Sequence, residues 1–108
     1  MPKIDIASID PKQLAPGLMA RFVHSEHMTL SFVEVTAGSM LAEHSHPHEQ
    51  VATVIEGEFE LTVAGEPIIF GPGSVVVIPS NVRHSGRAIT DCKLLDVFNP
   101  VREDYRAL

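Results

Sequence analysis

A cluster of histidines in the middle of the chain has the residue types and spacing to bind a transition metal. His44, His46 and His48 stand close together, and Glu49 and Gln50 follow them directly. In an extended segment successive side chains point to opposite faces, so His44, His46 and Gln50 would share one face. Imidazole suits zinc, copper, iron and nickel, so this face predicts a seat for a divalent transition metal.

The residues alone do not decide which side chains complete this metal site. If Pro47 bulges the strand, the parity of the side chains reverses and Glu49 competes with Gln50. The only distant histidine that precedes a strand-like run is His84, which makes it the candidate for a fourth donor. Taken alone, His84 is more typical of a surface loop residue beside Arg83.

A second group of polar residues lies in the run from Asp96 to Tyr105. In a strand, Asp96 and Phe98 would share the face of Leu94, so an inward Leu94 would carry Asp96 inward as well. A carboxylate in a protein interior is costly unless it is paired or functional. Asp96 is therefore predicted either to form a salt bridge with Arg102 or to act as an acid in a reaction.

Short strands are the elements that must position these residues. From Arg21 onward, runs rich in Val, Ile and Phe alternate with turns that contain Gly, Pro or Asn, and no long stretch has helical periodicity. This pattern favours an all-β sandwich or barrel. The run at 75–78 is typical of a strand buried on both faces. The expected strands cover residues 28–35, 51–55, 59–63, 68–70, 75–78, 82–89 and 93–98.

The composition limits the class of protein. The chain has 108 residues, of which 44% are hydrophobic, and this suits one domain with a modest core. A net charge of −6 without a basic run disfavours nucleic acid and membrane as partners. The single cysteine, Cys92, fits a reducing compartment. Neither a signal-peptide core nor a membrane-length apolar run is found, so the expected location is the cytoplasm.

The spacing around the histidines resembles two motifs of the cupins. The first motif, G-x5-H-x-H-x3-E-x6-G, is matched with Gln in place of Glu by Gly38, His44, His46, Gln50 and Gly57. The second, G-x5-P-x-G-x2-H-x3-N, is matched by Gly73, Pro79 and His84. Asn81 stands at the second Gly of that motif, and Ala88 stands at its final Asn.

This resemblance implies a cupin double-stranded β-helix, a jelly-roll-like barrel, over residues 21–108, with residues 1–20 as an N-terminal arm. It implies that His44, His46, Gln50 and His84 bind one divalent metal ion, with Zn, Ni, Mn and Fe as candidates. The spacing to Gly57 favours Gln50 over Glu49. Cupins of this size commonly pair, so a homodimer is expected.

A closer resemblance covers the C-terminal run. DVFNPVREDY, following HSHPHEQ, is similar to the pectin-degradation cupins of the KdgF type, in which an Asp, a Phe and an Arg spaced D-x-F-x3-R act beside a His, His, Gln, His metal site. The matching residues are Asp96, Phe98 and Arg102. The resemblance implies an enzyme that opens 4,5-unsaturated uronates, small anionic sugars, to linear 4-deoxy-5-keto uronates.

The roles implied by this resemblance can be assigned residue by residue. Asp96 would be the general acid–base, Phe98 would shape the pocket wall, and Arg102 would grip the substrate carboxylate bidentately. A neutral ligand set leaves the metal its full charge, which favours Lewis-acid chemistry. The alternatives are a dioxygenase or cyclase on the same site and a non-catalytic sugar-binding or sensing module.

Overall fold

The computed structural model describes residues 2–108 and consists mainly of antiparallel β-strands, which confirms the all-β, jelly-roll-like architecture predicted from the sequence. The strands are β1 (Lys12–Ala15), β2 (Leu18–His24), β3 (Thr29–Val35), β4 (Met40–His44), β5 (Glu49–Glu56), β6 (Phe59–Val63), β7 (Glu66–Phe70), β8 (Val75–Ile78), β9 (His84–Ala88) and β10 (Cys92–Asn99). A 3-10 helix, η1 (Ile6–Ser8), precedes them, and a short helix, α1 (Glu103–Arg106), follows them.

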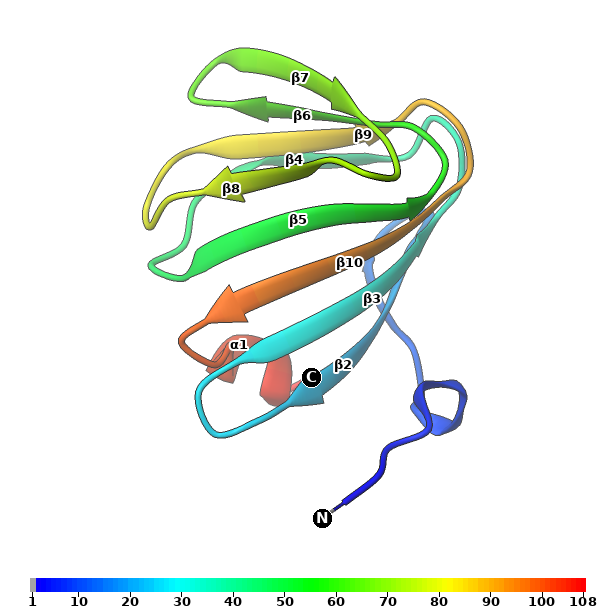
Figure 1. Cartoon of the computed structure of the whole chain (residues 1–108), viewed down its shortest axis with the longest axis vertical. Helices are drawn as coiled ribbons and strands as arrows, with labels where there is room; N and C mark the ends of the chain where they lie inside the picture. The colour runs from blue at the N-terminus through cyan, green and yellow to red at the C-terminus, as the bar shows by residue number, and fades with distance from the viewer. Residues whose placement is uncertain (1) are drawn as a thin grey trace.

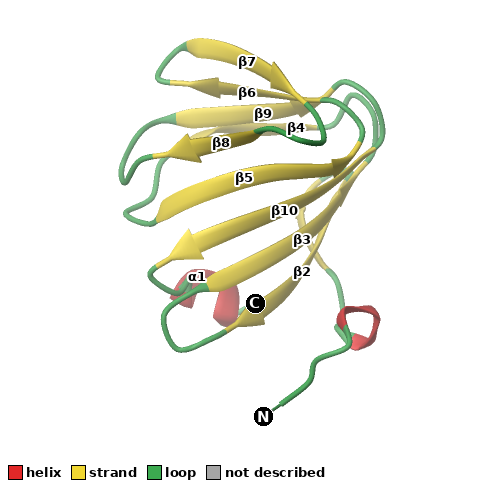
Figure 2. Ribbon diagram, in the orientation of Figure 1, coloured by secondary structure: helices red, strands yellow, loops and turns green. Residues whose placement is uncertain are grey.

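The strands form two sheets that face each other. One sheet has six strands in the order β1-β2-β3-β10-β5-β8, and the other has four in the order β4-β9-β6-β7 (Figures 1 and 2). Every pairing is antiparallel. The last strand, β10, lies between β3 and β5 at the centre of the larger sheet, so a C-terminal strand pairs there with two strands from earlier in the chain.

The hydrophobic core lies between the two sheets because alternate residues of each strand point inward. Phe59 and Leu61 of β6 are buried, and so are Val54 of β5 and Leu94 of β10, which are paired across the larger sheet. β9 passes so close to β6 that a Cβ atom at Gly86 would lie 2.7 Å from the ring of Phe59. Glycine is therefore needed at this position of β9.

Residues 12–20, which the sequence analysis assigned to an arm, lie in β1 and the start of β2. Pro11 and Pro16 flank β1 rather than interrupt it. Leu18 and Ala20 of β2 pair with β3 and are buried in the core. This stretch therefore adds two strands to the edge of the larger sheet.

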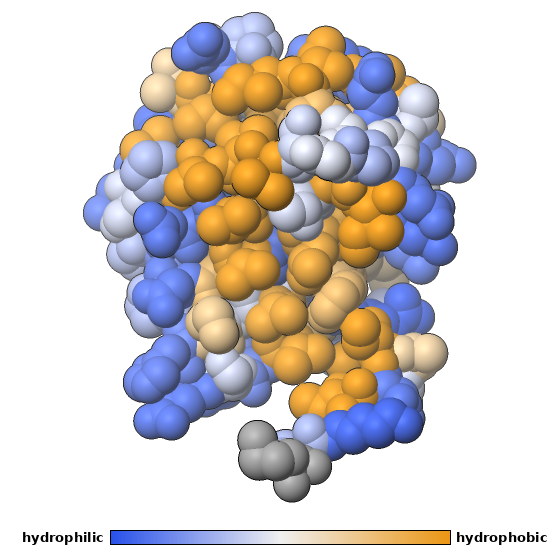
Figure 3. Space-filling view, viewed as in Figure 1, coloured by the Kyte–Doolittle hydropathy of each residue, from blue (hydrophilic) through white to orange (hydrophobic). Residues whose placement is uncertain are grey.

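The prediction that the run at 75–78 is buried on both faces is wrong. Val76 and Ile78 are buried, but Val75 and Val77 are 59% and 54% exposed. β8 is an edge strand, and its outward face continues across the larger sheet, where apolar side chains gather in Figure 3. One row of this outer face crosses five strands through Val23, Leu30, Val97, Val51 and Val77. Among the described residues, 2–108, no helix has the length and apolar character to cross a membrane.

Candidate metal centre

The strand register brings three histidines together at one end of the space between the sheets. His44 ends β4, His84 begins β9, and the two residues are paired directly. His46 lies in the loop between β4 and β5, and its carbonyl accepts a hydrogen bond of 2.8 Å from the backbone N–H of Asn81 in the loop before β9. One nitrogen from each of the three rings lies within 4.8 Å of the others.

Each of the three imidazoles has its Nδ1 fixed by a backbone carbonyl. Since a carbonyl can only accept, each Nδ1 must carry the hydrogen, and the lone pair is on Nε2. Such partners orient the histidines that bind metals in proteins. The carbonyls belong to Ala42 for His44, at 2.8 Å, to His48 for His46, at 3.0 Å, and to Val82 for His84, at 2.8 Å.

The Nε2 atoms have an environment that fits a cation. That of His84 is buried and has no hydrogen-bond partner among residues 2–108. That of His46 lies 3.2 Å from Oε1 of Gln50. The amide of Gln50 also acts on Asp96, where it lowers the pKa of the carboxyl against the larger effect of burial. The three histidines can therefore hold a metal ion, and the amide oxygen of Gln50 lies beside them.

Gln50 rather than Glu49 is the residue placed beside His46. Gln50 is buried on the inward face of β5, whereas Glu49 is exposed. Pro47 precedes β5 and does not interrupt it, and the pairing of β5 with β8 is regular from Gln50 onward. The single extended segment assumed from the sequence is not present, however, because His44 ends β4, His46 lies in the loop, and Gln50 belongs to β5 in the other sheet.

Burial also sets the protonation of the histidines. Desolvation, with smaller contributions from Arg102 and His84, lowers the pKa of His46 to about 4. Desolvation is likewise the largest cause of the lowered pKa of His84. Both rings are therefore neutral at pH 7, which is the form that binds a metal ion.

Asp96 and Phe98 extend from β10 into the same cavity. Phe98 pairs with Gln50 across the sheet, and its ring meets the ring of His46 edge-on at 5.6 Å between centroids. Burial raises the pKa of Asp96 to about 7, against the opposing effects of the Gln50 amide and Arg102. The cavity is lined by both groups of candidates, among them His44, Gln50, His84, Asp96, Phe98 and Arg102.

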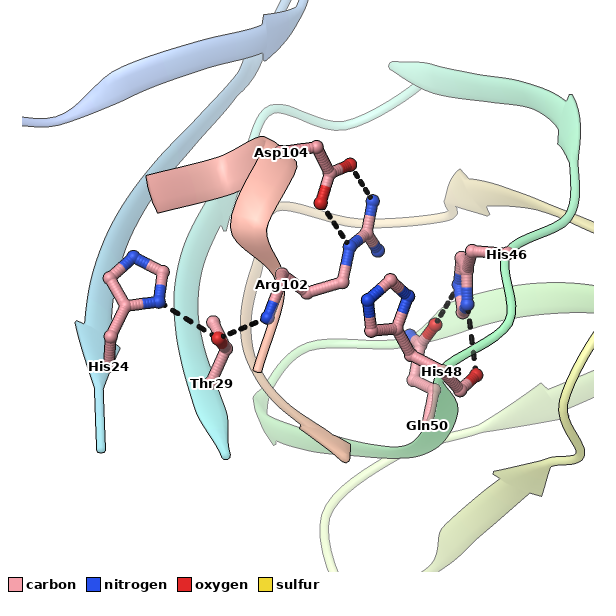
Figure 4. Close-up of polar contacts among 7 residues, drawn as sticks. All are labelled: His24, Thr29, His46, His48, Gln50, Arg102 and Asp104. Carbon is pink, nitrogen blue, oxygen red and sulfur yellow. Dashed lines mark hydrogen bonds and ion pairs between the residues drawn. The ribbon is translucent and has the colours of Figure 1, made fainter. Parts of the chain in front are cut away.

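Arg102 is buried and forms an ion pair with Asp104, not the salt bridge with Asp96 that the sequence left open. Its Nε donates to Oδ1 of Asp104 at 3.0 Å and its Nη2 to Oδ2 at 2.7 Å (Figure 4). One bidentate edge of the guanidinium, predicted to be available to a substrate, is thus occupied by the protein itself. The cause is local, because α1 begins directly after Arg102 and turns Asp104 back over it.

Sequence reasoning gave no role to Tyr105 or Asp104. The ring centroid of Tyr105 lies 3.7 Å from the guanidinium carbon of Arg102, and Tyr105 also lines the cavity. Their positions in the sequence could have indicated a role, since Asp104 and Tyr105 follow Arg102 within three residues.

Comparisons with known proteins agree with this geometry. A family model described as Cupin domain matches residues 31–98. The chain is 27% identical over 97 residues to the pectin degradation protein KdgF of Dickeya dadantii (strain 3937), covering 87% of this chain and 88% of that protein.

Two solved structures have a similar fold. KdgF from Halomonas sp. has a TM-score of 0.83 and 28% identity, over 89% of this chain and 90% of that one. An RmlC-like cupin from Shewanella frigidimarina NCIMB 400 has a TM-score of 0.85 and 27% identity, over 92% of this chain and 90% of that one.

Proposed function

This chain belongs to the cupin domain family, and from that premise we propose that it is a metal-dependent enzyme that opens the ring of 4,5-unsaturated uronates to linear 4-deoxy-5-keto uronates. The observation that carries the proposal is that one cavity is lined by two histidines of the cluster, His44 and His84, and by the D-x-F-x3-R residues Asp96, Phe98 and Arg102. Similarity to two KdgF proteins over most of their length supports the same substrate class.

The proposed reaction is an isomerisation that moves one proton. The substrate is a cyclic hemiacetal whose ring oxygen, O5, belongs to an enol ether. When the C1–O5 bond breaks, its electron pair passes to O5, and the hydroxyl on C1 loses its proton as the C1 aldehyde forms. Protonation of C4 then converts the C5 enol into a ketone. No oxidant or second substrate is needed.

The residues of the cavity can perform these steps. Asp96 is the group that would take the proton from the C1 hydroxyl and return one to C4. Arg102 would donate hydrogen bonds to the substrate carboxylate, and Phe98 would form the wall against the sugar ring. His44, His46, Gln50 and His84 would hold a divalent ion, which supplies Lewis-acid stabilisation of negative charge that develops on oxygen.

The experiment that tests this proposal is an absorbance assay with the purified protein. The conjugated enol ether of an unsaturated uronate absorbs in the ultraviolet, and this absorbance should disappear at a rate proportional to protein concentration. Binding of the uronate without loss of absorbance would instead indicate a sugar-binding module. Consumption of oxygen with bound iron would indicate a dioxygenase.

We further propose that two copies of the chain associate through the outer face of the larger sheet, in the cytoplasm. Antiparallel sheets usually have a polar outer face, but here the row from Val23 to Val77 is apolar on all five strands. Val75 and Ile55 extend this apolar surface, with 59% and 50% of their areas exposed. Depletion of charge is typical of interface cores, and two flat sheets can pack face to face.

A further inference from the structure

The guanidinium of Arg102 contacts two aromatic rings that are nearly perpendicular to each other. Its central carbon is 3.7 Å from the ring centroid of Tyr105 and 4.8 Å from that of Phe98. Tyr105 is itself stacked on Phe22, with 4.6 Å between centroids. Arginine stacks favourably on aromatic faces. Stacking on Tyr105, the nearer ring, therefore restricts the plane of the guanidinium, but it does not fix the rotation of the guanidinium within that plane.

Asp104 supplies the missing constraint. Its two carboxylate oxygens accept from Nε and Nη2 of Arg102 along one edge of the guanidinium. A bidentate pair of this kind has a defined orientation as well as a favourable energy. The backbone N–H of Arg102 is held too, because it donates to Oγ1 of Thr29 at 2.9 Å (Figure 4).

One guanidinium nitrogen of Arg102 is left over. The side chain is only 6% exposed, yet Nη1 has no hydrogen-bond partner in the part of the chain that the structure describes, residues 2–108. In Figure 4 this nitrogen lies on the side of the guanidinium away from Asp104, where His46 and His48 are found. A buried N–H without an acceptor costs free energy, and an acceptor from a ligand would remove that cost.

From this arrangement we infer that Asp104 is a positioning residue, which turns Nη1 of Arg102 toward the cavity so that it donates to a carboxylate oxygen of a sugar acid. Asp104 is not among the residues that line the cavity, and its side chain is 57% exposed. It therefore acts through Arg102 rather than on the substrate. The inference rests on the proposed function for the class of anion and deepens it by assigning how that anion is held.

The two roles of Asp104, its orientation of the guanidinium and its negative charge, predict opposite effects of Asp104→Asn on the binding of an anion. Removal of a negative charge beside Arg102 would strengthen binding of an anion, whereas loss of the bidentate pair would release the guanidinium to rotate. Asp104 is largely exposed, and at 0.15 M salt the screening length is about 8 Å. A misplaced binding group can cost one or two orders of magnitude. Loss of orientation should therefore dominate, and Asp104→Asn should weaken binding.

The composition of the chain provides the measurement. Tyr105 is its only tyrosine and there is no tryptophan, so intrinsic fluorescence reports on the ring stacked against Arg102. The purified protein is titrated with D-galacturonate at 0.15 M and 0.5 M NaCl, with D-galactose as the uncharged control sugar. Circular dichroism verifies that each variant is folded. We expect saturable binding of galacturonate and none of galactose at the same concentrations.

The variants separate orientation from charge. Asp104→Asn should raise the dissociation constant at least about tenfold at both salt concentrations. Asp104→Glu, which keeps a carboxylate at a different reach, should give an intermediate loss. Glu103→Gln is the matched control, because it removes the neighbouring charge, which pairs with Arg106 rather than Arg102, and it should stay within about twofold.

Several results would overturn the inference. They are equal or tighter binding by Asp104→Asn, an equal loss in Glu103→Gln, and no binding of galacturonate by the unmodified protein. Should Asp104→Asn fail to fold, Asp104→Glu decides, because unchanged binding by that variant would also overturn the inference. Failure of the proposed function is distinguishable, since the expected galacturonate titrations without turnover of an unsaturated uronate would leave Asp104 as a positioning residue in a sugar-acid binding site.

Discussion

At the scale of single residues, the candidate centre depends on backbone carbonyls as well as on imidazoles. The carbonyls of Ala42, His48 and Val82 fix which nitrogen of each histidine has its lone pair free. We expect His46→Ala to lower the affinity for a divalent metal at least roughly a hundredfold, because one of the three imidazoles of the proposed site is lost. Calorimetric titration with zinc measures this, and His27→Ala, at an exposed histidine, should leave the affinity unchanged.

Asp96 is the residue on which catalysis is proposed to depend. The substitution Asp96→Asn keeps the shape of the side chain and removes its ability to take a proton. We expect the variant to fold, to retain its metal and to lose at least roughly a hundredfold in rate, within the range of general acid–base catalysis. The absorbance assay with an unsaturated uronate measures the loss. Normal turnover by Asp96→Asn would leave Asp96 with a structural role only.

The residues around the metal centre could be predicted from the sequence to different degrees. Motif spacing selected Gln50, whereas the extended strand assumed for residues 44–50 is absent, since a loop that contains His46 joins β4 to β5 in the other sheet. Motif spacing could not predict that Asp104 is the ion-pair partner of Arg102. Asp104 is reached because α1 turns back over the arginine, and neither periodicity nor spacing describes that turn.

At the scale of elements, β9 pairs with β4, which brings His84 beside His44, and packs closely against β6 at Gly86. An alanine at Gly86, two residues further along β9, would press its Cβ atom against the ring of Phe59. We expect Gly86→Ala to lower the free energy of unfolding by about 1–3 kcal/mol, as overpacking of a core does. Urea denaturation measures the change, and Arg87→Gln, on the exposed face of the same strand, should change it by less than about 1 kcal/mol.

The strands themselves were mostly predictable because alternation with a period of two is a local property of the sequence. β6 and β8 begin and end where the pattern placed them. The burial of β8 was not predictable, since an unbroken valine run is equally compatible with a central strand and with an edge strand whose outer face is apolar. β1 and the start of β2 were difficult to predict because Pro11 and Pro16 indicate an irregular segment. Both are strands because β2 pairs with β3 and β1 pairs with β2.

At the scale of the whole molecule, the apolar outer face of the larger sheet is a prediction about assembly. If two copies cover this face, the mass in solution should be twice the 11.8 kDa of one chain. Val77→Asp places a charge at the β8 end of the row, where the side chain is 54% exposed, and should give the monomer, with its fold intact because Val77 points away from the core. Sedimentation equilibrium measures both. A monomeric unmodified protein at micromolar concentration would contradict the proposed interface.

The central claim is that this cupin opens an unsaturated uronate at a metal centre, and proton NMR of the reaction in D₂O tests it most directly. The protein is first treated with a chelator and then loaded with Zn, Ni, Mn or Fe in turn. With at least one of these ions, the enol-ether proton signal of the substrate should disappear, and the product should have a ketone at C5 and one deuterium at C4, because C4 receives an exchangeable proton. The chelated protein should match the rate without protein. A metal-loaded protein that leaves the substrate unchanged, or converts it equally fast after chelation, would contradict the account.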